Sequence, residues 1–146
     1  MLLWLLSGPL PVNSAAPDFT LPDQDGNPVT LSQLRGKNVV LVFCPGDEAA
    51  ICARQLCELR DRRELAAANP TVVLGISPQS REAQAEFRAK HRLPFPLLSD
   101  AGQKVAALYH SRGMFARRTV YVVDKEGVIR FAKRGHPAAE EVLAAA

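Results

Sequence analysis

Two runs of consecutive apolar residues, at positions 38–43 and 71–76, dominate the pattern of hydrophobic and polar residues along the chain. Short runs of this kind, rich in Val, are typical of strands that are buried on both faces of a sheet. The sequence PGD breaks the pattern after the first run, and a long helix is predicted over about residues 47–68. A strand, a helix and a second strand therefore form the centre of the predicted fold.

Shorter segments complete the pattern on either side. A helix is predicted over about residues 80–91, with Ala83, Phe87 and Ala89 toward the core. The other expected elements are hairpins at 18–31 and 119–131, a helical turn at 32–34, a helix at 104–109 and a last helix from about residue 138. This order predicts an α/β, thioredoxin-like fold: a central mixed β-sheet flanked by helices, with an N-terminal β-hairpin.

Length and charge narrow the function classes. The 146 residues suit one domain, which we place at 12–146 after an N-terminal extension at 1–11. The net charge is +3, but the basic residues are scattered, which argues against a nucleic-acid partner. The apolar start is short, lacks a preceding Lys or Arg and is broken by Gly8, so a membrane helix is not expected. We expect a cytoplasmic protein, with export as the alternative.

Candidate chemistry lies in three cysteines within fourteen residues, Cys44, Cys52 and Cys57. An odd number of thiols in a chain of this size argues against a disulfide-stapled secreted domain. The spacings also differ from those of a structural zinc site, so no metal is expected. The cluster falls where a central strand runs into the long helix, and sites of open α/β sheets lie at such carboxyl ends of strands.

Cys52 is expected in the first turn of the long helix. Unpaired N–H groups and the helix dipole favour an anion there, and the thiolate is the reactive form of cysteine. Arg118, directly before the strand predicted at 119–123, is a candidate for a second positive group. A solvated arginine at the strand end is the competing interpretation.

Cys57 lies five residues beyond Cys52. On an intact helix the two Cα atoms are about 8.5 Å apart, whereas a disulfide needs a separation of no more than about 7 Å. The spacing therefore favours a redox cycle with local unwinding over a permanent disulfide. For Cys44 we favour a buried role at the strand end, with an alternative resolving partner across the loop as the second interpretation.

The chain resembles the bacterioferritin-comigratory, or peroxiredoxin Q type, peroxiredoxins over about residues 12–146. The segments that carry the resemblance are APDFTLPD at 16–23, FCP at 43–45, CARQLC at 52–57, LRD at 59–61, GIS at 75–77, LSD at 98–100 and RTVYVVD at 118–124. The resemblance implies a thiol peroxidase for hydrogen peroxide or organic hydroperoxides. In it Cys52 is the peroxidatic cysteine, Cys57 the resolving cysteine, Arg118 the active-site arginine and Pro45 a shield of the thiolate from water.

The resemblance also implies the cycle and its partners. An intramolecular disulfide forms and is reduced by thioredoxin or glutaredoxin, no cofactor takes part, and the protein is a monomer or weak dimer. One residue departs from the family pattern: Ala49 stands where a Thr or Ser hydroxyl hydrogen-bonds the thiolate. A redox sensor or disulfide-exchange module would tolerate this alanine, as would a catalytically silent scaffold, so both stay as alternatives.

Overall fold

A five-stranded mixed sheet forms the centre of the computed structural model, which describes residues 8–44, 49–63, 70–112 and 118–146. The strand order is β5-β4-β3-β6-β7. β3 pairs with β4 in parallel, as β4 does with β5, whereas β6 is antiparallel to both β3 and β7. The strands are β3 (Asn38–Phe43), β4 (Thr71–Ser77), β5 (Leu97–Ser99), β6 (Thr119–Val123) and β7 (Ile129–Arg134). The predicted mixed sheet is confirmed.

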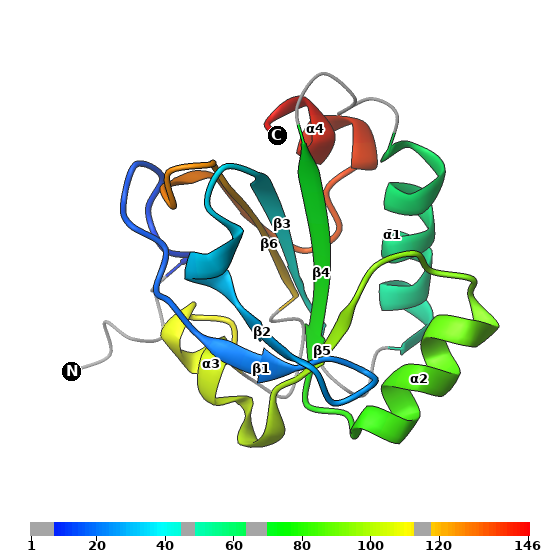
Figure 1. The fold of residues 1–146 in the computed structure, drawn as a ribbon. Helices are drawn as coiled ribbons and strands as arrows, with labels where there is room; N and C mark the ends of the chain where they lie inside the picture. Colours follow the sequence, from blue (N-terminus) through cyan, green and yellow to red (C-terminus); the bar gives the residue numbers. More distant parts are fainter. Residues whose placement is uncertain (1–7, 45–48, 64–69, 113–117) are drawn as a thin grey trace.

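The helices cover both faces of this sheet (Figure 1). They are α1 (Ala49–Asp61), α2 (Arg81–Lys90), α3 (Lys104–Leu108) and α4 (Ala139–Ala144), with 3-10 turns η2 (Leu31–Leu34) and η4 (Ala101–Gln103). α1 and α4 lie on one face, and α3 lies on the other beside the N-terminal hairpin. None of the helices in the described ranges has the length and apolar character that a membrane span requires.

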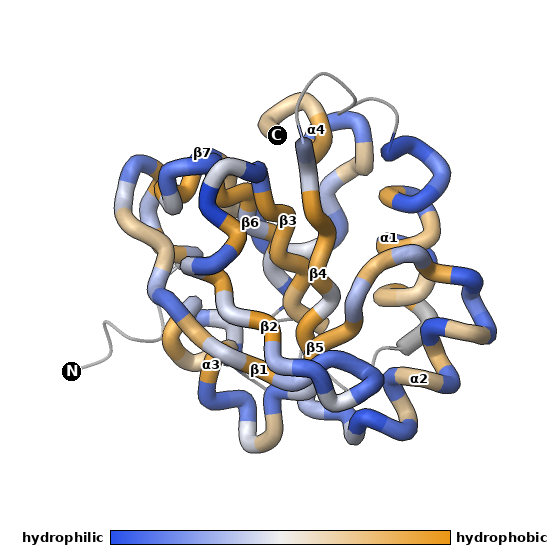
Figure 2. Tube along the Cα trace, in the orientation of Figure 1, coloured by the Kyte–Doolittle hydropathy of each residue, from blue (hydrophilic) through white to orange (hydrophobic). Residues whose placement is uncertain are grey.

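β3 feeds side chains into both core layers, because successive residues of a strand point to opposite faces. Val39, Leu41 and Phe43 pack in the layer that contains α3 and the hairpin. Val40 and Val42 pack in the layer under α1 and α4. Figure 2 shows the resulting hydrophobic centre, with the apolar colour concentrated on β3, β4 and β6 and the hydrophilic colour on the outer turns and helices.

The predicted N-terminal hairpin is confirmed and forms its own two-stranded sheet, β1 (Thr20–Pro22) with β2 (Pro28–Thr30). In its turn, the Asp23 carboxylate accepts hydrogen bonds from two backbone N–H groups farther along the turn, each at 2.9 Å. The Gln24 side-chain oxygen accepts a bond of 3.1 Å from the backbone N–H of Leu97. The turn is thereby tied to β5, the edge strand of the main sheet, and covers one of its donors.

Two details of the helices differ from the predictions. Helix α1 ends at Asp61, whereas the prediction extended it to about residue 68. The predicted start at 47–48 and residues 64–69 lie outside the described residues. Leu59 is the last buried residue of the helix, and the charged residues that follow it offer no apolar face to the sheet.

The predicted buried face of α2 was partly wrong. Ala83 and Phe87 are half-buried, but Ala89 is exposed, and the residue that is fully buried is Gln84. Ala89 lies about 140° around the helix from Gln84, since each residue advances by about 100°. The Gln84 amide donates to Ser77 Oγ and to the Leu98 carbonyl, both at 2.9 Å, and so bridges β4 and β5.

We expect Gln84→Ala to lower the free energy of unfolding by about 1–3 kcal/mol, because it leaves two buried acceptors without their donor. The exposed position on the same helix gives the matched control: Ala89→Glu is expected to change stability by less than about 0.5 kcal/mol. Urea unfolding followed by circular dichroism measures both. Equal effects of the two substitutions would contradict the bridging role of Gln84.

Candidate active site

The site forms where β3 ends and α1 begins. Cys44 directly follows β3, and its backbone N–H donates to the Ile76 carbonyl at 2.8 Å, so it extends the ladder with β4. Cys52 lies in the first turn of α1, as predicted. The structure joins these two cysteines in a disulfide, with 6.0 Å between their Cα atoms. That separation lies in the usual range for a disulfide.

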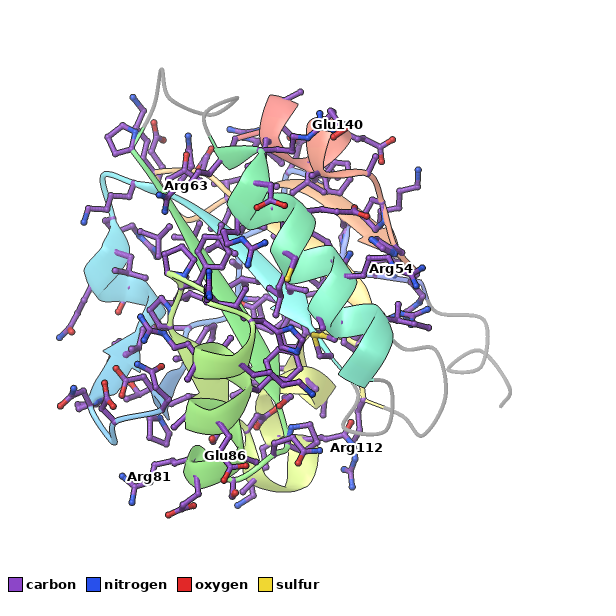
Figure 3. All side chains as sticks on the ribbon, turned by 90° about the vertical axis from the view of Figure 1, so that its right-hand side faces the viewer. Arg54, Arg63, Arg81, Glu86, Arg112 and Glu140 are labelled. Carbon is purple, nitrogen blue, oxygen red and sulfur yellow. A yellow bond between two sulfur atoms is a disulfide. The ribbon has the colours of Figure 1, made fainter. Side chains whose placement is uncertain are left out.

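Both bonded cysteines are buried, Cys44 at 8% exposure and Cys52 at 4%. They belong to the core layer under α1, together with Val40 and Val42. In Figure 3, Arg54 on the same helix points away from the sheet, in agreement with its exposure. The alternation along β3 therefore sends Cys44 to the face that α1 covers, and the first turn of α1 brings Cys52 to meet it.

The observed pairing corrects the interpretation favoured for Cys44. The sequence favoured a buried residue without a partner, and the structure shows it bonded to Cys52 across the loop. Cys57 is the free cysteine among the described residues and is half-buried on α1. The predicted Cys52–Cys57 disulfide is not the pair seen, because α1 is intact from Ala49 through Asp61 and holds those two residues apart. The resolving role of Cys57 stays a prediction.

Arg118 lies at the same end of the sheet. The register between β3 and β6 pairs Phe43 with Thr119, so the next pair outward along the antiparallel ladder is Cys44 and Arg118. The Arg118 carbonyl accepts a hydrogen bond of 2.8 Å from the backbone N–H of Gly135. The backbone thus fixes this arginine beside the strand end that carries Cys44. Pro45, the predicted shield of the thiolate, lies outside the described residues.

Two polar residues with a place in the structure were not singled out from the sequence. Arg134 on β7 donates to Thr119 Oγ1 at 3.0 Å, on the face of the sheet opposite to the cysteine pair. Gln55 on α1 is 2% exposed, and among the described residues neither polar atom of its side chain has a hydrogen-bond partner. A buried amide inside an amphipathic helix leaves no signal in the apolar pattern.

A cavity of about 190 Å³ borders the disulfide on the β4 side of β3. Its walls are mostly apolar and come from α1, α2, β4 and β5, with polar groups from Ser77, Gln79 and Gln84. Gly75 forms part of the floor, and a Cβ there would come within 2.8 Å of Leu97 Cδ2. The missing side chain lets Leu56 and Leu97 approach over β4. The cysteine pair therefore lies between an apolar cavity over β4 and a cationic residue directly before the start of β6.

Within the described ranges, no group of three or more His, Cys, Asp or Glu side chains is arranged to hold a metal ion. The chemistry that the site offers there is that of cysteine. Its parts are a buried disulfide, a third thiol on the same helix and a nearby arginine. An α/β sheet with a cysteine pair between its central strand and the following helix defines a thioredoxin-like protein with a thiol–disulfide site.

Comparison with known proteins agrees with this class. The AhpC/TSA family model matches residues 12–132. The chloroplastic peroxiredoxin Q of Oryza sativa subsp. japonica is 41% identical over 134 residues, covering 87% of this chain and 60% of the rice protein. The peroxiredoxin bcp of Coxiella burnetii is 38% identical over 127 residues, covering 81% of this chain and 84% of that protein.

The crystal structure of peroxidoxin BcpB from Mycobacterium tuberculosis superimposes with a TM-score of 0.81 at 31% identity, covering 92% of this chain and 94% of that one. The chain belongs to the AhpC/TSA family of peroxiredoxins, in its bacterioferritin-comigratory, peroxiredoxin Q branch. The thioredoxin-like fold predicted from the order of elements is confirmed. The chain spans about 60% of the length of the rice and wheat relatives.

Proposed function

We propose that this protein is a thiol peroxidase that reduces hydrogen peroxide or organic hydroperoxides with Cys52. The observation that carries the proposal is the position of Cys52: in the first turn of α1, buried, and within bonding distance of a second cysteine. Helix N-terminal N–H groups stabilise a thiolate at this position. Membership of the peroxiredoxin family supports the same chemistry.

In the reduced protein, the Cys52 thiolate attacks the distal peroxide oxygen. The S–O bond forms as the O–O bond breaks, and water or an alcohol leaves after taking a proton. Arg118 and the helix N–H groups stabilise the charge that develops on the oxygens. Pro45 shields the thiolate from water in this proposal. Cys52 ends the step as a sulfenic acid.

A second thiol then condenses with the sulfenic acid and releases water, which gives an intramolecular disulfide. Cys57 is the resolving cysteine that the family relationship supports, and Cys44 is bonded to Cys52 in the structure. An external dithiol of the thioredoxin or glutaredoxin kind returns the protein to its reduced form. Neither a metal nor an organic cofactor takes part, and we propose a monomer or weak dimer.

A redox sensor or disulfide-exchange module is the second candidate. It is favoured by Ala49, the first residue of α1, which lacks the hydroxyl that would hydrogen-bond the thiolate. Such a module would use the same cysteines without rapid peroxide turnover.

Replacing the proposed nucleophile tests the peroxidase function directly. Cys52→Ser is expected to abolish peroxide consumption in stopped-flow assays while the circular dichroism spectrum stays that of the native fold. Cys57→Ser is the matched control on the same helix, and it should still consume one equivalent of peroxide per chain. Full activity of Cys52→Ser would overturn the proposal. A wild-type protein that forms disulfides but turns peroxide over slowly would favour the sensor.

The missing hydroxyl gives a second prediction. A hydrogen bond to a charged group is worth about 1.5–3 kcal/mol, which corresponds to about ten- to over a hundredfold in rate. Ala49→Thr is therefore expected to accelerate Cys52 oxidation at fixed pH, with Ala49→Val as the control of the same shape. An equal response to both variants would show that the hydroxyl plays no part.

The cavity beside the disulfide suggests that the substrate carries an apolar group. Ala83, on α2, lines this cavity, whereas Ala85 on the same helix does not. Ala83→Leu is expected to raise KM for cumene hydroperoxide by about tenfold or more, since a few methylene groups in a pocket have effects of this size. KM for hydrogen peroxide should not change, and Ala85→Leu should leave both values unchanged. A parallel loss for both peroxides would mean that the cavity does not receive the substrate.

A further inference from the structure

We propose that the three cysteines form a relay: Cys44 captures the sulfenic acid on Cys52, and Cys57 then takes over the disulfide and presents it to the reductant. The proposal rests on the peroxidase function above and adds an order in which the two partner thiols act. It is carried by the Cys44–Cys52 bond, by the intact helix around Cys52 and by the different burial of the three cysteines.

The first step follows from the distances. Cys44 reaches Cys52 with 6.0 Å between the Cα atoms while α1 is formed from Ala49 onward. Cys57 is about 8.5 Å from Cys52 on the same helix, beyond the reach of a disulfide. Cys44 is also held at the end of the β3–β4 ladder by its N–H bond to Ile76. Capture by Cys44 therefore requires no unwinding, whereas capture by Cys57 does.

The second step follows from burial. At 8% and 4% exposure, Cys44 and Cys52 leave little surface for an external thiolate, which must approach the disulfide along the S–S axis. Cys57 is half-buried at the edge of the core layer under α1, and it is the most exposed of the three cysteines. After an exchange that replaces the Cys44–Cys52 disulfide with a Cys52–Cys57 disulfide, a protein reductant could reach the bond at Cys57.

Each step balances. The Cys44 thiolate attacks the Cys52 sulfenic sulfur, the S–S bond forms, the S–O bond breaks, and hydroxide leaves and takes up a proton as water. When the first turns of α1 open, the Cys57 thiolate attacks the Cys52 sulfur and Cys44 leaves as a thiolate, without net oxidation. The external dithiol, of the thioredoxin kind, then supplies two electrons and reduces Cys52–Cys57.

The test treats reduced wild-type, Cys44→Ser and Cys57→Ser proteins with one equivalent of hydrogen peroxide, followed by rapid alkylation and mass mapping of the disulfides. We expect Cys57→Ser to form the Cys44–Cys52 bond at the wild-type rate but to lose turnover with thioredoxin. Cys44→Ser should form the Cys52–Cys57 bond at a rate lower than that of Cys44–Cys52 formation in the wild type by a factor of about ten or more. A tenfold lower rate corresponds to a barrier higher by ~1.4 kcal/mol. The Cys44→Ser variant should also accumulate sulfinic acid at Cys52 under excess peroxide.

Hydrogen exchange gives an independent measurement. The amides of residues 54–58 should stay protected in the Cys44–Cys52 form and exchange quickly in the Cys52–Cys57 form. Because Cys44 is buried, Cys44→Ala accompanies Cys44→Ser in case the polar side chain disturbs the fold.

The outcomes separate the two proposals. Sulfinic acid at Cys52 in Cys57→Ser, without a Cys44–Cys52 bond, would overturn the relay and leave the peroxidase function intact. Unchanged disulfide formation in both Cys44 variants, or full thioredoxin turnover in Cys57→Ser, would also overturn it. Failure of peroxide to oxidise Cys52 in any variant would overturn both proposals.

Discussion

Burial of β3 on both faces is the constraint on which the site depends. Because Val40 and Val42 pack under α1 while Val39, Leu41 and Phe43 pack on the opposite side, a shift of the strand by one residue would exchange the side chains of the two core layers and disrupt the packing of both. Cys44 is the next position in that alternation, so its side chain is committed to the α1 face. The first turn of α1 lies over the same strand end. The meeting of Cys44 and Cys52 is thus a consequence of core packing.

The same arrangement creates opposing demands on Cys52. Its burial limits contact with water, which protects a sulfenic acid but opposes the charged thiolate. The helix start and the arginine beside Cys44 act in the other direction, since both stabilise negative charge. The cavity over β4 leaves space beside the cysteine pair. The two neighbours of β3 therefore contribute differently: β6 carries the cationic residue, and β4 lines the cavity.

Much of this could be predicted from the sequence, and the failures have physical causes. The strands followed from their apolar runs and turn residues, and the first-turn position of Cys52 followed from the strand that precedes it. Ala89 was misplaced and Gln84 missed because apolarity alone does not show that a polar side chain bridges two strands from a buried helix face. A bond from Cys44 to another cysteine was the less favoured interpretation, because the separation of two residues in sequence does not give their Cα distance across a loop. The alternation of Val40, Val42 and Cys44 along the strand did indicate the face of the sheet on which Cys52 lies.

The observed Cys44–Cys52 bond and the proposed Cys52–Cys57 bond differ in how much of α1 has to unwind for each to form. Leu56 lies between Cys52 and Cys57, is 2% exposed, and forms a wall of the cavity beside the disulfide. Unwinding that brings Cys57 to Cys52 would withdraw Leu56 from the sheet, and exposing such a side chain costs about 1.5–3 kcal/mol. Leu59, one turn farther on, stays packed against the sheet and anchors the rest of α1. The helix can therefore open at its start without detaching as a whole, but the open form is disfavoured by the lost packing. In the proposed relay, that difference places the buried bond at the resting end of the cycle and makes reduction of the protein depend on how often the first turns of α1 open.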